Sequence, residues 1–114
     1  MTNLFAVPLC LLASLLAAPA IAGVNGFALV NQTGAALSGV ELRRVGGKDW
    51  VPVAAAPASG ASAAVSFNNP DCAFDLRAAV AGAGPTTWRG INLCDVKSVT
   101  LNRDGSGRTW VDYD

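Results

Sequence analysis

The chain has 114 residues, a length that suits one small domain. Its eight basic and eight acidic side chains cancel, so it lacks the positive charge that is typical of nucleic-acid-binding proteins. It contains no histidine, which excludes Ser-His-Asp and Cys-His catalytic sets.

The first 22 residues predict a signal peptide. This stretch has no charged residue and a Leu-rich centre, and Ala20-Ile21-Ala22 before Gly23 fits the small-x-small pattern that signal peptidase cuts. Cleavage after Ala20 and a retained membrane anchor are the alternatives, while Cys10 lies too early for a lipoprotein cysteine. We therefore expect a mature domain over 23–114 that is periplasmic or secreted, with no further membrane span.

The mature chain is predicted to consist of short strands. Runs of Val, Leu, Phe, Trp and Thr are broken by Gly, Pro, Asn and Asp, which is the pattern of an all-β protein. Seven strands are expected, at 26–32, 37–45, 63–69, 72–80, 86–94, 98–104 and 108–113. The segment 51–62, with two prolines and many alanines, is interpreted as a short edge strand followed by an irregular crossover.

These elements predict an all-β fold, a single small antiparallel β-sandwich of immunoglobulin-like type with about seven strands. A small β-barrel is the alternative. Segments 98–104 and 108–113 are expected to form a hairpin across a Gly-containing tip.

Cys72 and Cys94 are the cysteines that remain after signal removal, and we interpret them as a structural disulfide. A hairpin centred on Ala83, within Gly-Ala-Gly-Pro, would place Cys72 opposite Cys94, at a separation that a disulfide accepts. The same register pairs residue 74 with 92, 76 with 90 and 78 with 88. A redox pair usually has Cys-x-x-Cys spacing, and a zinc site needs further Cys or His ligands.

Asp71 and Asp95 flank the two cysteines and are the candidate ligands for a calcium ion or a small molecule. Aspartate is also a common turn residue that hydrogen-bonds its own backbone. We therefore predict no catalytic residues, no firm metal site and no cofactor.

The three tryptophans differ in expected environment. Trp88 shares a hairpin face with apolar residues and is predicted in the core. Trp50, after a Gly-rich loop, and Trp110, out of phase with its apolar neighbours, are candidate contacts for a partner. Asp75 and Arg77 should lie on an exposed polar face near Arg89, where an ion pair contributes about 0 to 1 kcal/mol.

Asn31-Gln32-Thr33 matches the acceptor pattern for N-glycosylation, a short pattern that often occurs by chance.

A wider pattern of residues resembles a family of small exported bacterial proteins of unknown function, each with a signal peptide and one β-rich domain. The matching motifs are Phe27-x-Leu29-x-Asn31-x-Thr33-Gly34, Trp50, Cys72-Ala73-Phe74-Asp75-Leu76-Arg77, Gly90-Ile91-Asn92-Leu93-Cys94, Gly107-Arg108-Thr109-Trp110 and Tyr113. The resemblance implies a bacterial host and an exported location, and no activity. Some relatives carry the name argininosuccinate lyase, a large helical enzyme that a chain so short and β-rich cannot be.

The leading hypothesis is an exported, non-enzymatic β-sandwich that binds a protein or a cell-envelope component. The alternative is a small-ligand or calcium-binding module at the Asp71 and Asp95 end.

Overall fold

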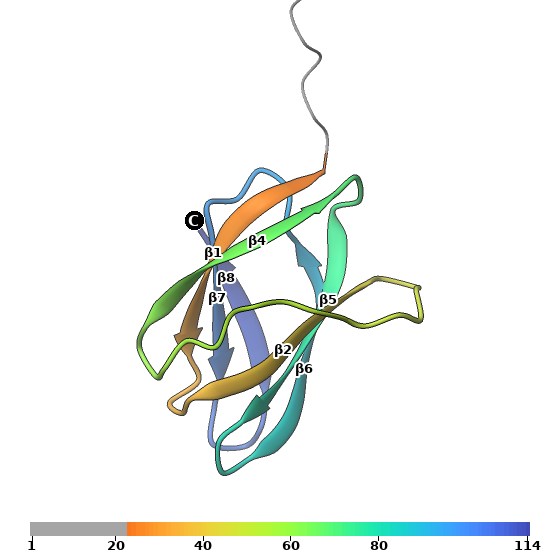
Figure 1. Ribbon diagram of the computed structural model, residues 1–114. Coiled ribbons are helices and arrows are strands. Elements are labelled where there is room, and N and C mark those ends of the chain that lie inside the picture. Colours follow the sequence, from red (N-terminus) through yellow and green to blue (C-terminus); the bar gives the residue numbers. More distant parts are fainter. Residues whose placement is uncertain (1–22) are drawn as a thin grey trace, which may run out of the picture.

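Eight strands make up the part of the chain that the structure describes, residues 23–114 of a computed structural model (Figure 1). The predicted signal peptide, residues 1–22, lies outside the described residues. The strands are β1 (Val24–Gln32), β2 (Leu37–Arg44), β3 (Val51–Pro52), β4 (Ser62–Asn69), β5 (Ala73–Val80), β6 (Gly84–Asn92), β7 (Ser98–Arg103) and β8 (Thr109–Tyr113). The seven predicted strands are confirmed to within two residues at each end, and the predicted edge strand in 51–62 is β3.

Two four-stranded sheets pack face to face, which confirms the predicted β-sandwich. The first has the order β4-β1-β7-β8 and the second β3-β2-β5-β6. All neighbours are antiparallel except β1 and β7, which are parallel. The sandwich is thus mainly antiparallel, and the β1–β7 pair is parallel because β7 arrives from the opposite sheet and no hairpin sets its direction.

Side chains that alternate inward fill the space between the sheets. Leu29 of β1 and Val99 of β7 meet Leu42 of β2 and Leu76 of β5 in one cluster, and all four are fully buried. Burial of this kind stabilises by about 1.5 to 3 kcal/mol for each large apolar side chain. The core therefore supplies most of the favourable free energy of folding.

A bulge in β2 explains the uneven spacing of its apolar residues. Ser38 pairs with Ala79 and Glu41 with Arg77, so two residues of β2 lie opposite the single residue Ala78. The extra residue shifts the alternation, so Leu37 is buried on the same face as Val40 although it lies three residues before it.

The hairpin of β5 and β6 forms as predicted, but its predicted register is wrong. Leu76 pairs with Trp88 rather than with residue 90, and the turn is centred on Gly82. At the disulfide end the pairing is one residue from the predicted register, with Phe74 opposite Ile91, and a bulge at Arg89 and Gly90, which together oppose Asp75, adds a second residue toward the turn. Gly90 has a φ of +65°, a left-handed conformation that glycine adopts without strain.

The predicted disulfide between Cys72 and Cys94 is confirmed, with 5.1 Å between the two Cα atoms. It joins the residue before β5 to a residue just after β6, so it clamps the open end of one hairpin within the second sheet. Closing a loop of this size stabilises by about 3 kcal/mol in the chain-entropy model.

Side chains of the last strands close one side of the sandwich. The Trp88 indole, buried as predicted, reaches from β6 to the other sheet and donates its Nε1–H to the carbonyl of Asn102 at 2.9 Å. The backbone N–H of Asn92 donates to the Tyr113 hydroxyl at 3.0 Å. Both bonds join the second sheet to the first.

On the opposite side the segment 53–61 forms the crossover from sheet to sheet (Figure 1). It first follows the free edge of β2, where Val53 donates to Val40 and Pro57 accepts from Leu37. It then reaches β1, because the N–H of Asn31 donates to the carbonyl of Ala61.

The Asn31 side chain fastens this crossover from inside the protein. Its residue is fully buried, and its amide donates to the carbonyls of Ala35 and Pro57 at 2.7 and 3.0 Å. Its Oδ1 accepts from the N–H and the hydroxyl of Thr33 at 3.0 and 2.7 Å. Both amide hydrogens are engaged, so in the folded protein this side chain is a structural group rather than an exposed acceptor of sugar.

We expect Asn31→Ala to lower the free energy of unfolding by about 3 kcal/mol, because it removes buried partners from two carbonyls and an N–H. Chemical denaturation at constant m-value checks this. Asn68→Ala, an exposed asparagine on β4, is the matched control and should change stability by less than about 0.5 kcal/mol. Equal losses in the two variants would contradict the fastening role.

Candidate functional site

Trp50 lies on the outer face of the second sheet, covered by charged side chains of its own chain. The guanidinium carbons of Arg43 and Arg77 are 4.4 and 4.2 Å from the centre of its ring. Arg43 forms an ion pair with Asp75 at 2.9 Å, and Arg77 forms one with Glu41 at 2.8 Å. The half-buried indole therefore packs against two cross-strand ion pairs of the second sheet. Its predicted contact with a partner stays a prediction.

Asp75 is buried beneath this cluster, and the expectation that it would be exposed is wrong. Its side chain is 8% exposed and accepts hydrogen bonds from Arg43 at 2.9 Å and from the N–H of Gly90 at 3.0 Å. Its ion-pair partner is Arg43, and Arg77 belongs to the other pair. The outer face is polar as predicted, and Arg89 is near enough to act on Asp75.

The pKa of Asp75 reflects two opposed effects. Burial raises it by penalising the charged carboxylate. The hydrogen bonds from Arg43 and Gly90 and the positive charges of Arg43 and Arg89 lower it by more, so the pKa falls below the ordinary value of 3.8.

Asp71 and Asp95 both lie beside the disulfide, as expected from the sequence. The Asp71 carboxylate faces the guanidinium of Arg44 at 3.3 Å, and its backbone N–H donates to Oδ1 of Asn69. Asp95 is an exposed turn residue with a φ of +59°. Residues 23–114 contain no group of three or more Cys, Asp and Glu side chains placed to hold a metal ion.

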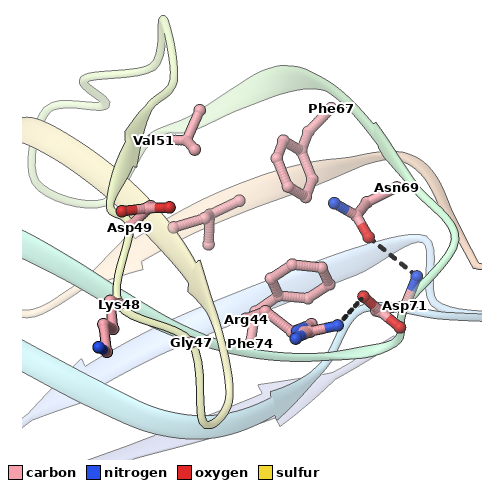
Figure 2. A pocket seen from close by; sticks show the side chains of 10 residues that line it. Arg44, Gly47, Lys48, Asp49, Val51, Phe67, Asn69, Asp71 and Phe74 are labelled. Carbon is pink, nitrogen blue, oxygen red and sulfur yellow. Dashed lines mark hydrogen bonds and ion pairs between the residues drawn. The ribbon is translucent and has the colours of Figure 1, made fainter.

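A hollow of about 310 Å³ opens beside Asp71, between the ends of the two sheets (Figure 2). We call it the slot. Leu42 and Phe74 form its covered floor, while half-buried Phe67 and exposed Val51 form its accessible apolar walls. Its other lining residues are Arg44, Gly47, Lys48, Asp49, Asn69 and Asp71.

A second hollow adjoins the slot across the Arg44–Asp71 ion pair, which lines both. It is lined further by Val45, Cys72 and Ala73. Val45 and Val51 are 46% and 47% exposed, which places an exposed branched apolar side chain on either side of this ion pair. We call the two hollows and their walls the slot face.

Sequence reasoning missed Val45 and Val51. Val45 is the last residue of the strand predicted over 37–45, directly after Arg43-Arg44, and Val51 begins the Pro-broken segment. A large apolar residue just beyond the paired part of a strand can indicate an exposed apolar site, because no neighbouring strand covers its side chain there.

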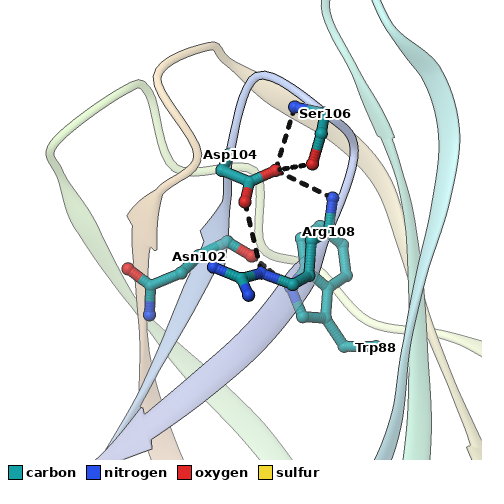
Figure 3. A network of polar contacts seen from close by, with 5 residues as sticks. All are labelled: Trp88, Asn102, Asp104, Ser106 and Arg108. Carbon is teal, nitrogen blue, oxygen red and sulfur yellow. Dashed lines mark hydrogen bonds and ion pairs between the residues drawn. The ribbon is translucent and has the colours of Figure 1, made fainter.

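Trp110 occupies a separate surface, on β8. It is 42% exposed, and the guanidinium of Arg108 lies 5.4 Å from its ring centre; its predicted contact with a partner stays a prediction. The adjoining loop is held by Asp104, whose Oδ1 accepts from the N–H and hydroxyl of Ser106 and the N–H of Arg108 (Figure 3). These hydrogen bonds, from Ser106 first, lower the pKa of Asp104.

We expect Asp75→Asn to lower stability at pH 7 by about 2 kcal/mol, because Arg43 loses a charged partner. A carboxylate whose pKa is lower in the folded than in the unfolded protein stabilises fully above the unfolded-state pKa. That contribution is lost as the pH falls through the folded-state pKa. The wild type should therefore lose more stability than the variant between about pH 5 and pH 2.

Urea denaturation across this pH range provides the measurement. Asp95→Asn, at an exposed turn position that asparagine also tolerates, is the matched control and should change stability at pH 7 by less than about 0.5 kcal/mol. Identical pH profiles for the wild type and Asp75→Asn would contradict the role given to this carboxylate.

Comparison with known proteins identifies no similar protein. The sequence matches no family model and no curated protein, and the fold matches no solved structure. A search of residues 23–114 for a helix long and apolar enough to span a membrane finds none.

Proposed function

We propose that this protein is an exported, non-enzymatic β-sandwich that binds a protein or another component of the cell envelope through its slot face. The observation that carries the proposal is the exposure of Val45 and Val51 on either side of the Arg44–Asp71 pair. Exposed apolar side chains within a charged rim are a common arrangement at protein interfaces.

Two features support export. The Cys72–Cys94 disulfide is compatible with an oxidising compartment. The first strand of the described residues begins at Val24, so a chain cut after Ala22 keeps all eight strands that the structure describes.

The rim of the slot is electrically balanced. Two basic residues, Arg44 and Lys48, and two acidic residues, Asp49 and Asp71, line the same opening. Such a rim favours a partner surface of mixed charge, and it provides no strong attraction for a polyanion or a polycation.

The carboxylates support a binding role more than acid/base chemistry. Glu41, Asp71 and Asp75 each lie against an arginine. A glycosidase-type pair needs two carboxyl groups directed at one substrate bond. The alternative function, a small-ligand or calcium-binding module using the Asp71 and Asp95 end, shares Asp71 with the slot and is separated by the measurements below.

We expect the protein recovered from its own host to begin at Gly23 and to be lighter than the reduced chain by the two hydrogens of one disulfide. Native mass spectrometry of the envelope fraction and the medium tests this. A retained amino terminus would contradict the predicted processing, and a calcium or small-molecule adduct would favour the alternative function.

We expect the double variant Val45→Ser, Val51→Ser to reduce in-cell cross-linking to the partner by at least about tenfold, because burial of each valine contributes roughly 1.5 kcal/mol. Quantitative mass spectrometry of cross-linked complexes provides the measurement. Trp110→Ala is the matched control on the other exposed surface. Loss with Trp110→Ala and none with the valine variant would move the interface to β8.

A further inference from the structure

Four strands form the edges of the two sheets, and three of them carry features that discourage pairing with another chain. β3 is two residues long and ends in Pro52. β6 has Pro85, Arg89 and the bulge at Gly90. β8 has five residues and includes Asp112.

The fourth edge strand, β4, differs from these. It has eight residues, Ser-Ala-Ala-Val-Ser-Phe-Asn-Asn, with no charge and no proline. Its only hydrogen-bonded neighbour strand in the structure of residues 23–114 is β1. Charged residues and prolines are the usual protection of an exposed edge, and here both are missing.

The hydrogen-bond pattern shows which groups of β4 face away from β1. Ala28 donates to Lys97 on the β7 side, so its neighbours Phe27 and Leu29 direct their backbone groups toward β4. Their partners are Val65 and Ala63. Ala64, between these two, therefore directs its N–H and C=O outward, where an added strand would lie.

A bulge connects this edge to the slot. Val65 pairs with Phe27 and Asn68 with Asn25, so Ser66 and Phe67 together oppose Gly26. Bulges often redirect a side chain next to a functional site. Phe67 lines the slot and meets Phe74 edge to face, with 5.3 Å between the ring centres (Figure 2).

We propose that β4 binds an extended segment of a protein partner as an additional antiparallel or parallel strand, with one apolar side chain of that segment in the slot. The inference rests on the proposed function and specifies how the partner is held. Main-chain hydrogen bonds at Ala64 supply attachment, and the slot beside Phe67 supplies selectivity.

The slot indicates whether the added strand is a free segment of a partner or the β4 strand of a second copy of this chain. In a strand that continues the sheet, alternate side chains point to the same face as Val65 and Phe67, toward the slot. A second folded copy has its own Val65 buried at 3% exposure and its own Phe67 packed on Phe74. Its β4 has no free inward side chain to offer, whereas an extended segment does.

The chemistry of the edge defines the segment. The outward side chains Ser62, Ala64 and Ser66 are small and exposed, so neighbouring positions of the segment should be uncharged and β-branched or small. The inward position should be Leu, Ile, Met or Phe. At about 310 Å³ the slot is near the lower limit of ligand cavities, which suits a single side chain.

Selection from a phage-displayed library of linear peptides of about nine residues, long enough to span β4, tests the proposal on the purified oxidised protein. We expect enriched sequences with one apolar residue between uncharged β-formers. The synthetic form of the most enriched peptide should slow hydrogen exchange at the Ala64 amide. Replacing its apolar residue by Ala should weaken binding roughly tenfold or more.

Two further changes separate strand addition from simple contact. N-methylation of alternate peptide residues, in each of the two possible phases, removes edge hydrogen bonds without touching the protein. One phase should weaken binding by at least roughly tenfold and the other should not. Ala64→Pro, which removes the outward N–H of β4, should likewise weaken peptide binding by at least roughly tenfold. Thr109→Pro is the control, because Ser98 and Asp114 exchange backbone hydrogen bonds and the N–H of Thr109 consequently points outward on β8.

Other results would overturn the proposal. They are the absence of enriched peptides, binding that is insensitive to N-methylation in either phase, or unchanged exchange at Ala64. A dimer in sedimentation that Ala64→Pro abolishes would assign the edge to a second copy. If Ala64→Pro leaves cross-linking to the partner intact while the Val45 and Val51 variant abolishes it, the slot face binds the partner and strand addition fails.

Discussion

The rest of the structure depends on one buried amide. Asn31 lies at the end of β1, and its side chain makes four hydrogen bonds that hold the following turn and the crossover at Pro57. Without them the chain would have polar groups inside an apolar core, at a cost of about 1 to 3 kcal/mol for each. The crossover is the route from the second sheet to β4, so Asn31 fixes the position of β4 and of the slot beside it.

The same local device ends several strands. Asn31, Asn69, Asn92 and Asp104 each stand at or next to a strand end and accept a hydrogen bond from the backbone N–H two residues ahead. A side chain that bonds its own backbone in this way favours a turn. The strand boundaries were predictable because these residues, with glycine and proline, mark them in the sequence. The cysteine pair was predictable from compartment and spacing.

Features that depend on bulges were not predictable. One extra residue at Arg89–Gly90 shifts every pair of the β5–β6 hairpin between the bulge and the turn. Neither residue type requires a bulge. The burial of Asp75 was missed because Trp50, from a loop distant in sequence, covers the outer face through Arg43 and Arg77. Alternation identifies which face a residue is on, and it does not reveal what lies above that face. For the same reason the slot, built from the two stretches 42–51 and 67–74, had no sequence signature.

The parallel pairing of β1 with β7 sets the order in which the molecule can be completed. A polypeptide is synthesised from its amino end, so β1 can pair with β4 long before β7 exists. Until the last strands appear, β1 has one unpaired edge, and the core residues Val99 and Leu101 are missing from the first sheet. Contacts between distant segments form slowly. Folding to the native state is therefore a late event in the life of the nascent chain, and oxidation of the two cysteines, both of which precede β7, can occur before it.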